Sequence, residues 1–309
     1  MSPSSVIRAV RIRVRAIGVF LVATVGFVGV YLIAVRTTGG QIVENRALET
    51  STPETEWLGL LRLVSVENLA IAGAALLVLA MVTRRPDAAL RVAAIMGLSN
   101  ALTQVLKYHV LSRPDFLDSW ADNTFPSGHT VAYASVLVSL VVVVPARARY
   151  LLALVVAVPM GIVSYQLLEY GWHRLSDVVG GLLLVTLLAA LTFAVAPERR
   201  VQQRPAARRF SMAVLAASAL GLSVGTAVLG GMVLLSEGLT DAGVLLAATE
   251  LGTVATVCVM LLLVLLLQDG QRTRRPRRPT AADALHPKTR VVETRTESEP
   301  APLQYATPQ

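Results

Sequence analysis

Long apolar stretches separated by short polar segments make up most of this chain. An α-helix needs roughly 20 mostly apolar residues to cross a bilayer. Eight stretches approach that length, at residues 16–35, 63–82, 89–107, 127–144, 150–168, 176–196, 210–235 and 242–267. The pattern therefore predicts an all-α, polytopic membrane helix bundle with about eight transmembrane helices.

The composition agrees with this pattern. Of the 309 residues, 54% are hydrophobic and 16% are charged, and the mean hydropathy is +0.61, a balance atypical of water-soluble domains. The single cysteine, Cys258, lies in an apolar run, which excludes a disulfide framework and a cysteine-rich metal site. The net charge of +8 does not indicate a nucleic-acid partner, because most arginines lie in short clusters between the apolar runs.

The arginine clusters predict the orientation in the membrane. Basic residues near helix ends favour the cytoplasmic side, and the clusters fall on one side of the predicted bundle: Arg8 to Arg15, Arg84 to Arg91, Arg147 and Arg149, Arg199 to Arg209, and Arg272 to Arg278. We therefore expect a multi-pass protein of the plasma membrane with both termini in the cytoplasm. The opposite connections, 36–62, 108–126, 169–175 and 236–241, would then be extracytoplasmic.

The same reading divides the chain into four parts. Residues 1–15 are a basic cytoplasmic N-terminus, 16–200 hold the first six helices, and 201–268 hold two additional transmembrane helices. No convincing cleavage site follows the first apolar run, so we expect it to remain as a helix. Residues 269–309 lack apolar periodicity and are predicted to form a disordered cytoplasmic tail. Membrane lipids are the expected surroundings, and the oligomeric state is left open.

The first of three polar clusters closes the predicted helix 89–107. Asn100, Thr103, Gln104 and Lys107 recur at three- and four-residue spacing, which gives the helix one polar face. Polar groups at membrane depth favour the bundle interior or a wet cavity over lipid. Two interpretations remain open: these residues belong to a site, or they only bond neighbouring helices while Lys107 reaches the interface.

The second cluster is a Pro-Ser-Gly-His stretch that begins the apolar helix near residue 127. A helix N-terminus offers unpaired backbone N–H groups and the positive end of the helix dipole, which suit a phosphate. Gly128 allows close approach to the backbone, and Ser127 adds a hydroxyl. The alternative is an ordinary helix N-cap, which explains Ser127 but gives no reason for His129.

The third cluster, residues 171–177, joins the predicted helices 150–168 and 176–196. His173 and Asp177 are four residues apart, a spacing that places both side chains on one face of a helical turn. A carboxylate there can hold one ring nitrogen protonated and leave the other free as a nucleophile or base. The alternative is that Asp177 caps the following helix and His173 is an interfacial polar residue.

The three clusters in this order resemble the type 2 phosphatidic acid phosphatase superfamily. The similarity extends over about residues 60 to 197, and residues 16–200, with the first six helices, are expected to form the phosphatase-like core. The superfamily signature is a Lys…Arg-Pro stretch, a Pro-Ser-Gly-His stretch and a Ser-Arg…His-xxx-Asp stretch. The matching residues are Lys107…Arg113-Pro114, Pro126-Ser127-Gly128-His129 and His173…Asp177.

The resemblance implies a metal-independent hydrolase of phosphoric monoesters or diphosphates that requires no cofactor and works through a phosphohistidine. It implies that His173 attacks phosphorus, Asp177 orients its ring, and His129 protonates the leaving oxygen. The residues implied to bind the phosphoryl oxygens are Lys107, Arg113, Ser127 and Gly128. The implied substrate is a lipid or isoprenoid phosphate held at the extracytoplasmic face.

Two positions depart from the superfamily pattern. Five residues, rather than six, separate Lys107 from Arg113. One missing residue would rotate the two cations about 100° apart on a helix, but the residue before a proline avoids helix, so we expect Arg113 in an extended loop. The arginine six residues before His173 is replaced by Leu167, and Gln166 precedes it in place of serine. Arg174 and His109 are the candidate substitute donors.

These departures keep other functions open. The principal alternative is a catalytically weak or inactive relative that binds lipid phosphates or assists a membrane partner. A transporter is suggested only by the number of helices and by Glu250 inside an apolar run, and no inverted repeat supports it. A metal site built from His129, His173 and Asp177 is the minor alternative to a phosphate site.

Overall fold

The computed structural model describes residues 3–52, 59–117, 123–196, 205–235 and 241–268. The predicted disordered tail, 269–309, and the arginines between 197 and 204 lie outside the described residues. The contiguous unit that contains the helices extends over residues 1–271.

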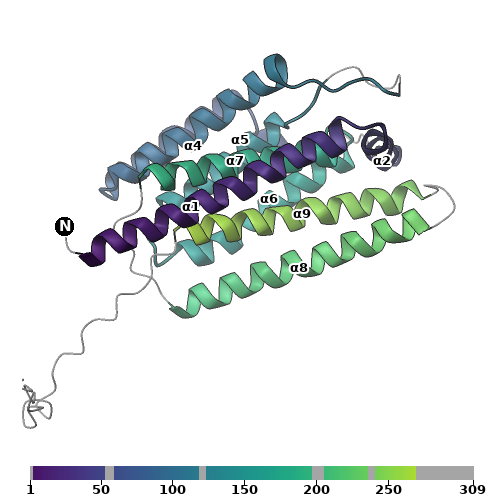
Figure 1. Cartoon of the computed structure of the whole chain (residues 1–309). Helices are drawn as coiled ribbons and strands as arrows, with labels where there is room; N and C mark the ends of the chain where they lie inside the picture. The colour runs from purple at the N-terminus through teal and green to yellow at the C-terminus, as the bar shows by residue number, and fades with distance from the viewer. Residues whose placement is uncertain (1–2, 53–58, 118–122, 197–204, 236–240, 269–309) are drawn as a thin grey trace, which may run out of the picture. The chain divides into compact units, whose positions relative to one another are not determined.

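All regular structure in the described residues is helical, and each of the eight predicted apolar stretches forms a helix (Figure 1). These helices are α1 (Pro3–Val30), α3 (Val66–Val82), α4 (Pro86–Val105), α5 (Gly128–Val143), α6 (Arg149–Glu169), α7 (Leu175–Val195), α8 (Pro205–Leu235) and α9 (Ala242–Leu267). Two π-helical turns, η1 (Tyr31–Val35) and η3 (Leu106–Val110), extend α1 and α4, and a short 3₁₀ turn, η2 (Leu61–Leu63), precedes α3. The predicted all-α fold is confirmed.

Six of the described helical segments are long and apolar enough to cross a bilayer, and α3 and α5 are shorter apolar helices. The chain is therefore a membrane protein. In lipid the backbone must satisfy its own hydrogen bonds, which is why such segments fold as helices.

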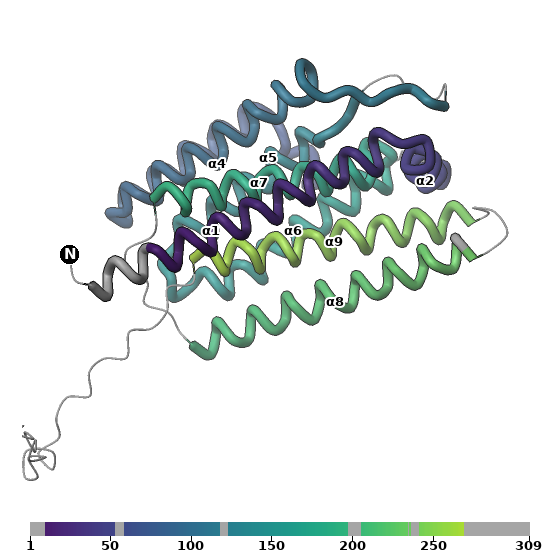
Figure 2. Tube along the Cα trace, viewed as in Figure 1, coloured from purple at the N-terminus to yellow at the C-terminus, as the bar shows by residue number. Residues whose placement is uncertain are grey.

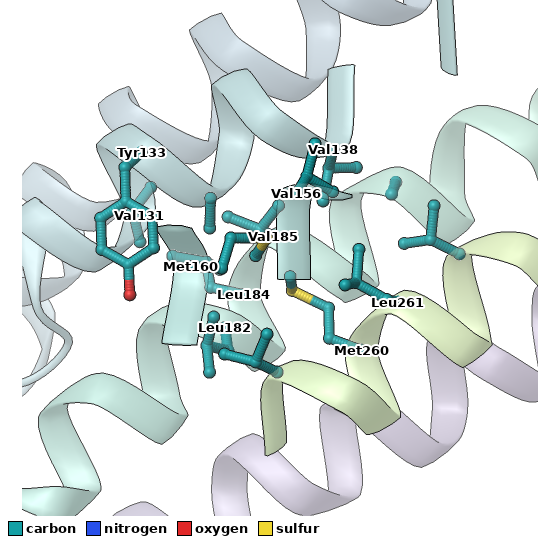
Figure 3. Packing of buried hydrophobic residues seen from close by; sticks show 14 of the residues in the cluster. Val131, Tyr133, Val138, Val156, Met160, Leu182, Leu184, Val185, Met260 and Leu261 are labelled. Carbon is teal, nitrogen blue, oxygen red and sulfur yellow. The ribbon is translucent and has the colours of Figure 1, made fainter. Parts of the chain in front are cut away.

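Helix α7 lies at the centre of the packing and contacts α1, α4, α5 and α9 (Figure 2). Lipid tails are as apolar as leucine, so helices associate in a membrane mainly through close packing, which small residues permit. On α7 this closeness comes from Gly180, Gly181, Ala189 and Ala190, all of them buried. Leu184 of α7 is buried in one hydrophobic cluster with Val138, Val156, Met160 and Met260 of the neighbouring helices (Figure 3).

A helix that the apolar pattern did not predict, α2 (Thr38–Leu48), lies in the connection 36–62. Its first turn contains two glycines, Gly39 and Gly40, which are poor helix formers. Thr37 caps it by accepting a hydrogen bond from the Gly40 amide, 3.0 Å, and its buried face carries Gln41, Glu44 and Ala47. A Cβ on Gly40 would lie 2.6 Å from the Ala34 carbonyl oxygen, so glycine is required where α2 folds back on η1.

Arginine side chains gather at one end of the bundle. Arg85 donates to the Val143 carbonyl at the end of α5, 2.8 Å, and Arg91 donates to the Ala196 carbonyl at the end of α7. Arg15 donates to Leu266 near the end of α9, 3.0 Å. Cations at helix C-termini are stabilised by the helix dipole and by the unpaired carbonyls. The second and third polar clusters lie at the opposite end of the bundle, where α5 and α7 begin.

Candidate active site

The structure brings the second and third sequence clusters together at the N-terminal ends of α5 and α7. His129 Nδ1 and His173 Nε2 lie 3.4 Å apart, and the two rings meet edge to face with centroids 5.6 Å apart. Trp172 flanks the pair, its ring centroid 5.7 Å from that of His129. The two imidazoles, 44 residues apart in the chain, thus share one place in the fold.

Asp177 stands behind His173. Its Oδ2 atom is 3.6 Å from His173 Nδ1, the ring nitrogen that faces away from His129. The distance is that of an ion pair rather than of a hydrogen bond. His173 is anchored by its backbone amide, which donates to the Leu167 carbonyl, 3.0 Å. The arrangement directs Nε2 of His173 toward His129 and Nδ1 toward the carboxylate.

The side chain of Asp177 is fully buried and accepts from three donors. Thr124 Oγ1 donates at 2.7 Å, the Arg174 amide at 3.0 Å, and Arg113 Nη2 at 3.1 Å. The bond from Arg174 is half of a capping box, so Asp177 does cap α7. The premise that His173 and Asp177 share a helical turn is wrong, because α7 begins only at Leu175 and the cap creates the juxtaposition.

Arg113 is buried between two carboxylates. Besides Asp177, it is 3.5 Å from Glu44 Oε2 through Nη1, and its Nη2 donates to Ser176 Oγ at 3.3 Å. Its Nε has no hydrogen-bond partner among the described residues. The expectation that Arg113 lies in a loop rather than a helix is confirmed, because the helical backbone ends with η3 and residues 111–115 have no regular structure.

The start of α5 faces the start of α7. Ser127 is the N-cap of α5 and accepts from the Thr130 amide at 3.2 Å, as the ordinary-cap interpretation predicted. Its own amide donates to the Asp177 carbonyl, 2.9 Å. A Cβ on Gly128 would meet only Gln104, at 3.8 Å, so space is open above this amide. Two helix N-termini therefore direct positive dipole ends into the same region.

The polar face of α4 serves two purposes. Asn100 donates to Ser135 Oγ on α5, 3.2 Å, so this residue bonds a neighbouring helix. Lys107 lies on η3, within electrostatic range of His129, and among the described residues its ammonium has no hydrogen-bond partner. The loop around it is fixed by Asn123, which donates to the Lys107 and Leu111 carbonyls at 3.1 and 3.0 Å.

The two substitute donors are placed differently. Arg174 is buried beside Asp177, where its Nε donates to Asn45 Oδ1 at 2.9 Å and its Nη1 to Thr124 Oγ1 at 3.5 Å. His109 is exposed on η3 and is not brought to the histidine pair. Leu167, at the position of the missing arginine, points into the hydrophobic core and is fully buried.

Charge in the cluster is nearly balanced. Arg113 and Arg174 lie beside Glu44 and Asp177, and Lys107 is within electrostatic range of His129, which leaves one excess positive charge when both carboxylates are ionised. Burial, followed by the nearby Asp177 carboxylate, raises the pKa of Glu44, while Arg113 and Ser176 act in the opposite direction. Burial, followed by the Arg113 guanidinium, lowers the pKa of Arg174.

Sequence reasoning assigned no role to Glu44, Asn45, Thr124 or Ser176. The first two lie on α2, whose sequence has neither apolar length nor a cluster of catalytic residue types. Thr124 lies two residues before the Pro-Ser-Gly-His stretch, and Ser176 lies between His173 and Asp177. This closeness in sequence could have indicated that both belong to the site. Within the described residues no group of three or more His, Cys, Asp or Glu side chains is arranged to hold a metal ion.

Comparison with known proteins adds one finding. Residues 88–201 match the family model described as the PAP2 superfamily. No curated protein and no solved structure matches the chain. The matched segment begins in α4 and includes the Lys107 to Arg113 stretch, the start of α5 and the His173–Asp177 pair. The match over this segment supports the resemblance to the type 2 phosphatidic acid phosphatase superfamily, whose members are phosphatases acting on phosphate esters.

Proposed function

We propose that this protein hydrolyses a lipid or polyprenyl phosphate or diphosphate at the extracytoplasmic face of the plasma membrane, through a phosphohistidine intermediate. The observation that carries the proposal is the meeting of His129 and His173, 3.4 Å apart, with Asp177 behind His173. Two imidazoles and one carboxylate in this order provide a proton donor, a nucleophile and a group that orients the nucleophile.

In the proposed reaction, the Nε2 lone pair of His173 forms a bond to phosphorus as the ester P–O bond breaks. His129 gives a proton to the departing oxygen. A water molecule then attacks phosphorus and gives a proton back to His129, the N–P bond breaks, and inorganic phosphate leaves. Asp177 keeps the proton of His173 on Nδ1 and stabilises the positive charge that develops on the ring.

The two rings must separate for a phosphate to enter. A reactive approach takes about 3–3.5 Å and a hydrogen bond to the leaving oxygen about 2.6–3.2 Å, and together they exceed the present 3.4 Å between the rings. His129 is the ring that we expect to move, because it is half-buried whereas His173 is buried and tied to Leu167. Substrate binding thus replaces a contact between the histidines.

The proposed phosphate cradle uses the unpaired donors of the site. Lys107 supplies a charge, the Gly128 amide lies at the positive end of α5, and the Nε–H of Arg113 is a buried donor with no partner among the described residues. The Ser127 hydroxyl can donate while it accepts from Thr130. These donors would hold the oxygens on which charge must be stabilised in the transition state.

A lipid substrate is supported by the position of the site. The histidine pair lies where α5 and α7 begin, at the end of the bundle opposite Arg15, Arg85 and Arg91. With the arginine-rich end in the cytoplasm, the site would lie at the level of the outer head groups. An acyl or prenyl chain can then remain beside the apolar helices while the phosphate enters the polar cluster.

The test compares leaving groups in purified protein with a metal chelator present. Wild type should release phosphate from a lipid phosphate, and His173→Ala should abolish release from every substrate. His129→Ala should lose the lipid phosphate but retain much of its activity on p-nitrophenyl phosphate, because that leaving group needs no proton. His286→Ala is the histidine control. Equal loss of both substrates in His129→Ala contradicts the proton-donor role, and inhibition by the chelator contradicts metal independence.

A second candidate function is a catalytically weak relative that binds lipid phosphates. Two observations favour it: Leu167 faces the core where the superfamily has an arginine, and Arg113 already pairs with two carboxylates. In this case wild type and His173→Ala would be equally inactive on a broad panel of lipid phosphates, and both would still bind inorganic phosphate.

A further inference from the structure

Helix α2 lies outside the segment that matches the superfamily, yet it brings a carboxylate into the site. Glu44 is 4% exposed. Its Oε1 accepts from the Ser176 amide at 2.7 Å, and its Oε2 accepts from Ser176 Oγ at 3.0 Å and lies 3.5 Å from Arg113 Nη1. Every described partner is a donor, so the geometry fits an ionised carboxylate.

Residues between Tyr31 and Glu44 contact three consecutive residues of the loop that carries Arg113, namely Ser112, Arg113 and Pro114. Tyr31 donates to the Ser112 carbonyl at 2.9 Å, Arg36 donates to Ser112 Oγ at 2.8 Å, and Gln41 donates to the Pro114 carbonyl at 2.6 Å. These bonds fix the backbone on both sides of Arg113. Among these loop contacts, only that of Glu44 pairs with the guanidinium of Arg113.

A single guanidinium between two carboxylates has a specific consequence for an anion site. Without Glu44, the charge of Arg113 would be shared only between Asp177 and an incoming phosphate, and phosphate would bind more tightly. Tight binding of the ground state and the product does not increase turnover. A carboxylate that shares Arg113 weakens that binding and also prevents the guanidinium from rotating away from Asp177.

We propose that Glu44 is a positioning residue that holds Arg113 against Asp177 and balances its charge, and thereby limits the affinity of the site for phosphate. The proposal rests on the proposed function for its catalytic part. The charged groups that face Glu44 are Asp177, Arg113 and Arg174, and Lys107 acts from the far side, through its proximity to His129.

The test compares two substitutions at this position. Glu44→Gln removes the charge and keeps the size, and Glu44→Asp keeps the charge and shortens the side chain. We expect Glu44→Gln to lower kcat by about 10–100-fold, as for groups that orient catalytic residues, while inorganic phosphate binds several-fold more tightly. Glu44→Asp should keep the wild-type Kd for phosphate and lower kcat. Glu49→Gln is the control, because Glu49 is exposed at the C-terminal end of α2 and paired with Arg46.

Phosphate binding, measured by calorimetry on the purified full chain, decides the inference without turnover. A role limited to folding would weaken phosphate binding, so an unchanged or higher Kd in folded Glu44→Gln overturns the proposal. If Glu44→Gln fails to fold, Glu44→Asp tests the proposal instead. A wild-type kcat in Glu44→Asp overturns the proposal, whereas a lowered kcat with a wild-type Kd for phosphate supports it. Should wild type prove inactive on all substrates, the proposed function fails, and the Kd of Glu44→Gln still tests the charge balance.

Discussion

Gly180 on α7 is the position where a single methyl group should do most damage to the site. A Cβ there would lie 2.7 Å from Phe125 Cζ and 3.2 Å from Phe125 Cδ2, and closer still to Cε2. Favourable carbon contacts lie at about 3.5–4.0 Å, so the ring would have to retreat by nearly 1 Å or more. Phe27 and Tyr31 oppose this, with ring centroids 5.0 and 5.5 Å from that of Phe125.

The expected cost of Gly180→Ala follows from two opposing effects. Overpacking a buried position costs about 1–3 kcal/mol, and alanine favours helix over glycine by about 1 kcal/mol. Because the short contacts place the overpacking cost at its upper end, we expect a net destabilisation of about 2 kcal/mol. Phe125 lies two residues before Ser127, so the shift should also displace the start of α5, and a displacement of about 1 Å can lower turnover about 100-fold.

The measurement uses the one cysteine of the chain. Cys258 is buried, so a thiol-reactive fluorescent dye reports thermal unfolding in detergent. Gly97→Ala on α4 is the matched control, because nothing lies within 4 Å of the added methyl group. Gly180→Ala should unfold at a lower temperature than wild type and the control should not. Equal midpoints and equal rates for the two variants would refute the packing argument.

Two further predictions concern charge and orientation. Arg113→Met should destabilise the folded protein by about 3–5 kcal/mol, because it leaves two buried carboxylates without their shared cation, and the same dye assay measures this. Asp115→Cys should react with an impermeant thiol reagent on intact cells, whereas Ala148→Cys, at the arginine-rich end, should react only after lysis. Labelling of Ala148→Cys alone would reverse the predicted orientation.

Apolar run length was enough to predict eight helices, six of them long enough to cross a bilayer, and motif order was enough to predict which polar stretches converge. Both predictions succeed because each depends on short stretches of sequence. A run of about 20 apolar residues has to span or be buried, and polar groups at helix ends avoid lipid by facing one another. The resemblance implied that His129 and His173 act on the same phosphate, and the structure places their ring nitrogens 3.4 Å apart.

Local reasoning failed where a partner comes from a distant element. The spacing of His173 and Asp177 suggested a shared helical turn, but the structure produces the pairing through the cap of α7. Helix α2 contains two glycines and no apolar run, so its own sequence does not favour a helix. Its contacts with η1 and α9 stabilise it instead.

The sequence by itself determined that this is a helical membrane protein with a phosphatase-type set of residues near two helix starts. Only the tertiary structure decided that Arg113 lies between Asp177 and Glu44, that Leu167 faces the core, and that the two imidazoles lie 3.4 Å apart. The physical reason is that hydropathy fixes which segments enter the membrane. The charge a buried side chain experiences depends on groups that only packing brings within a few ångströms.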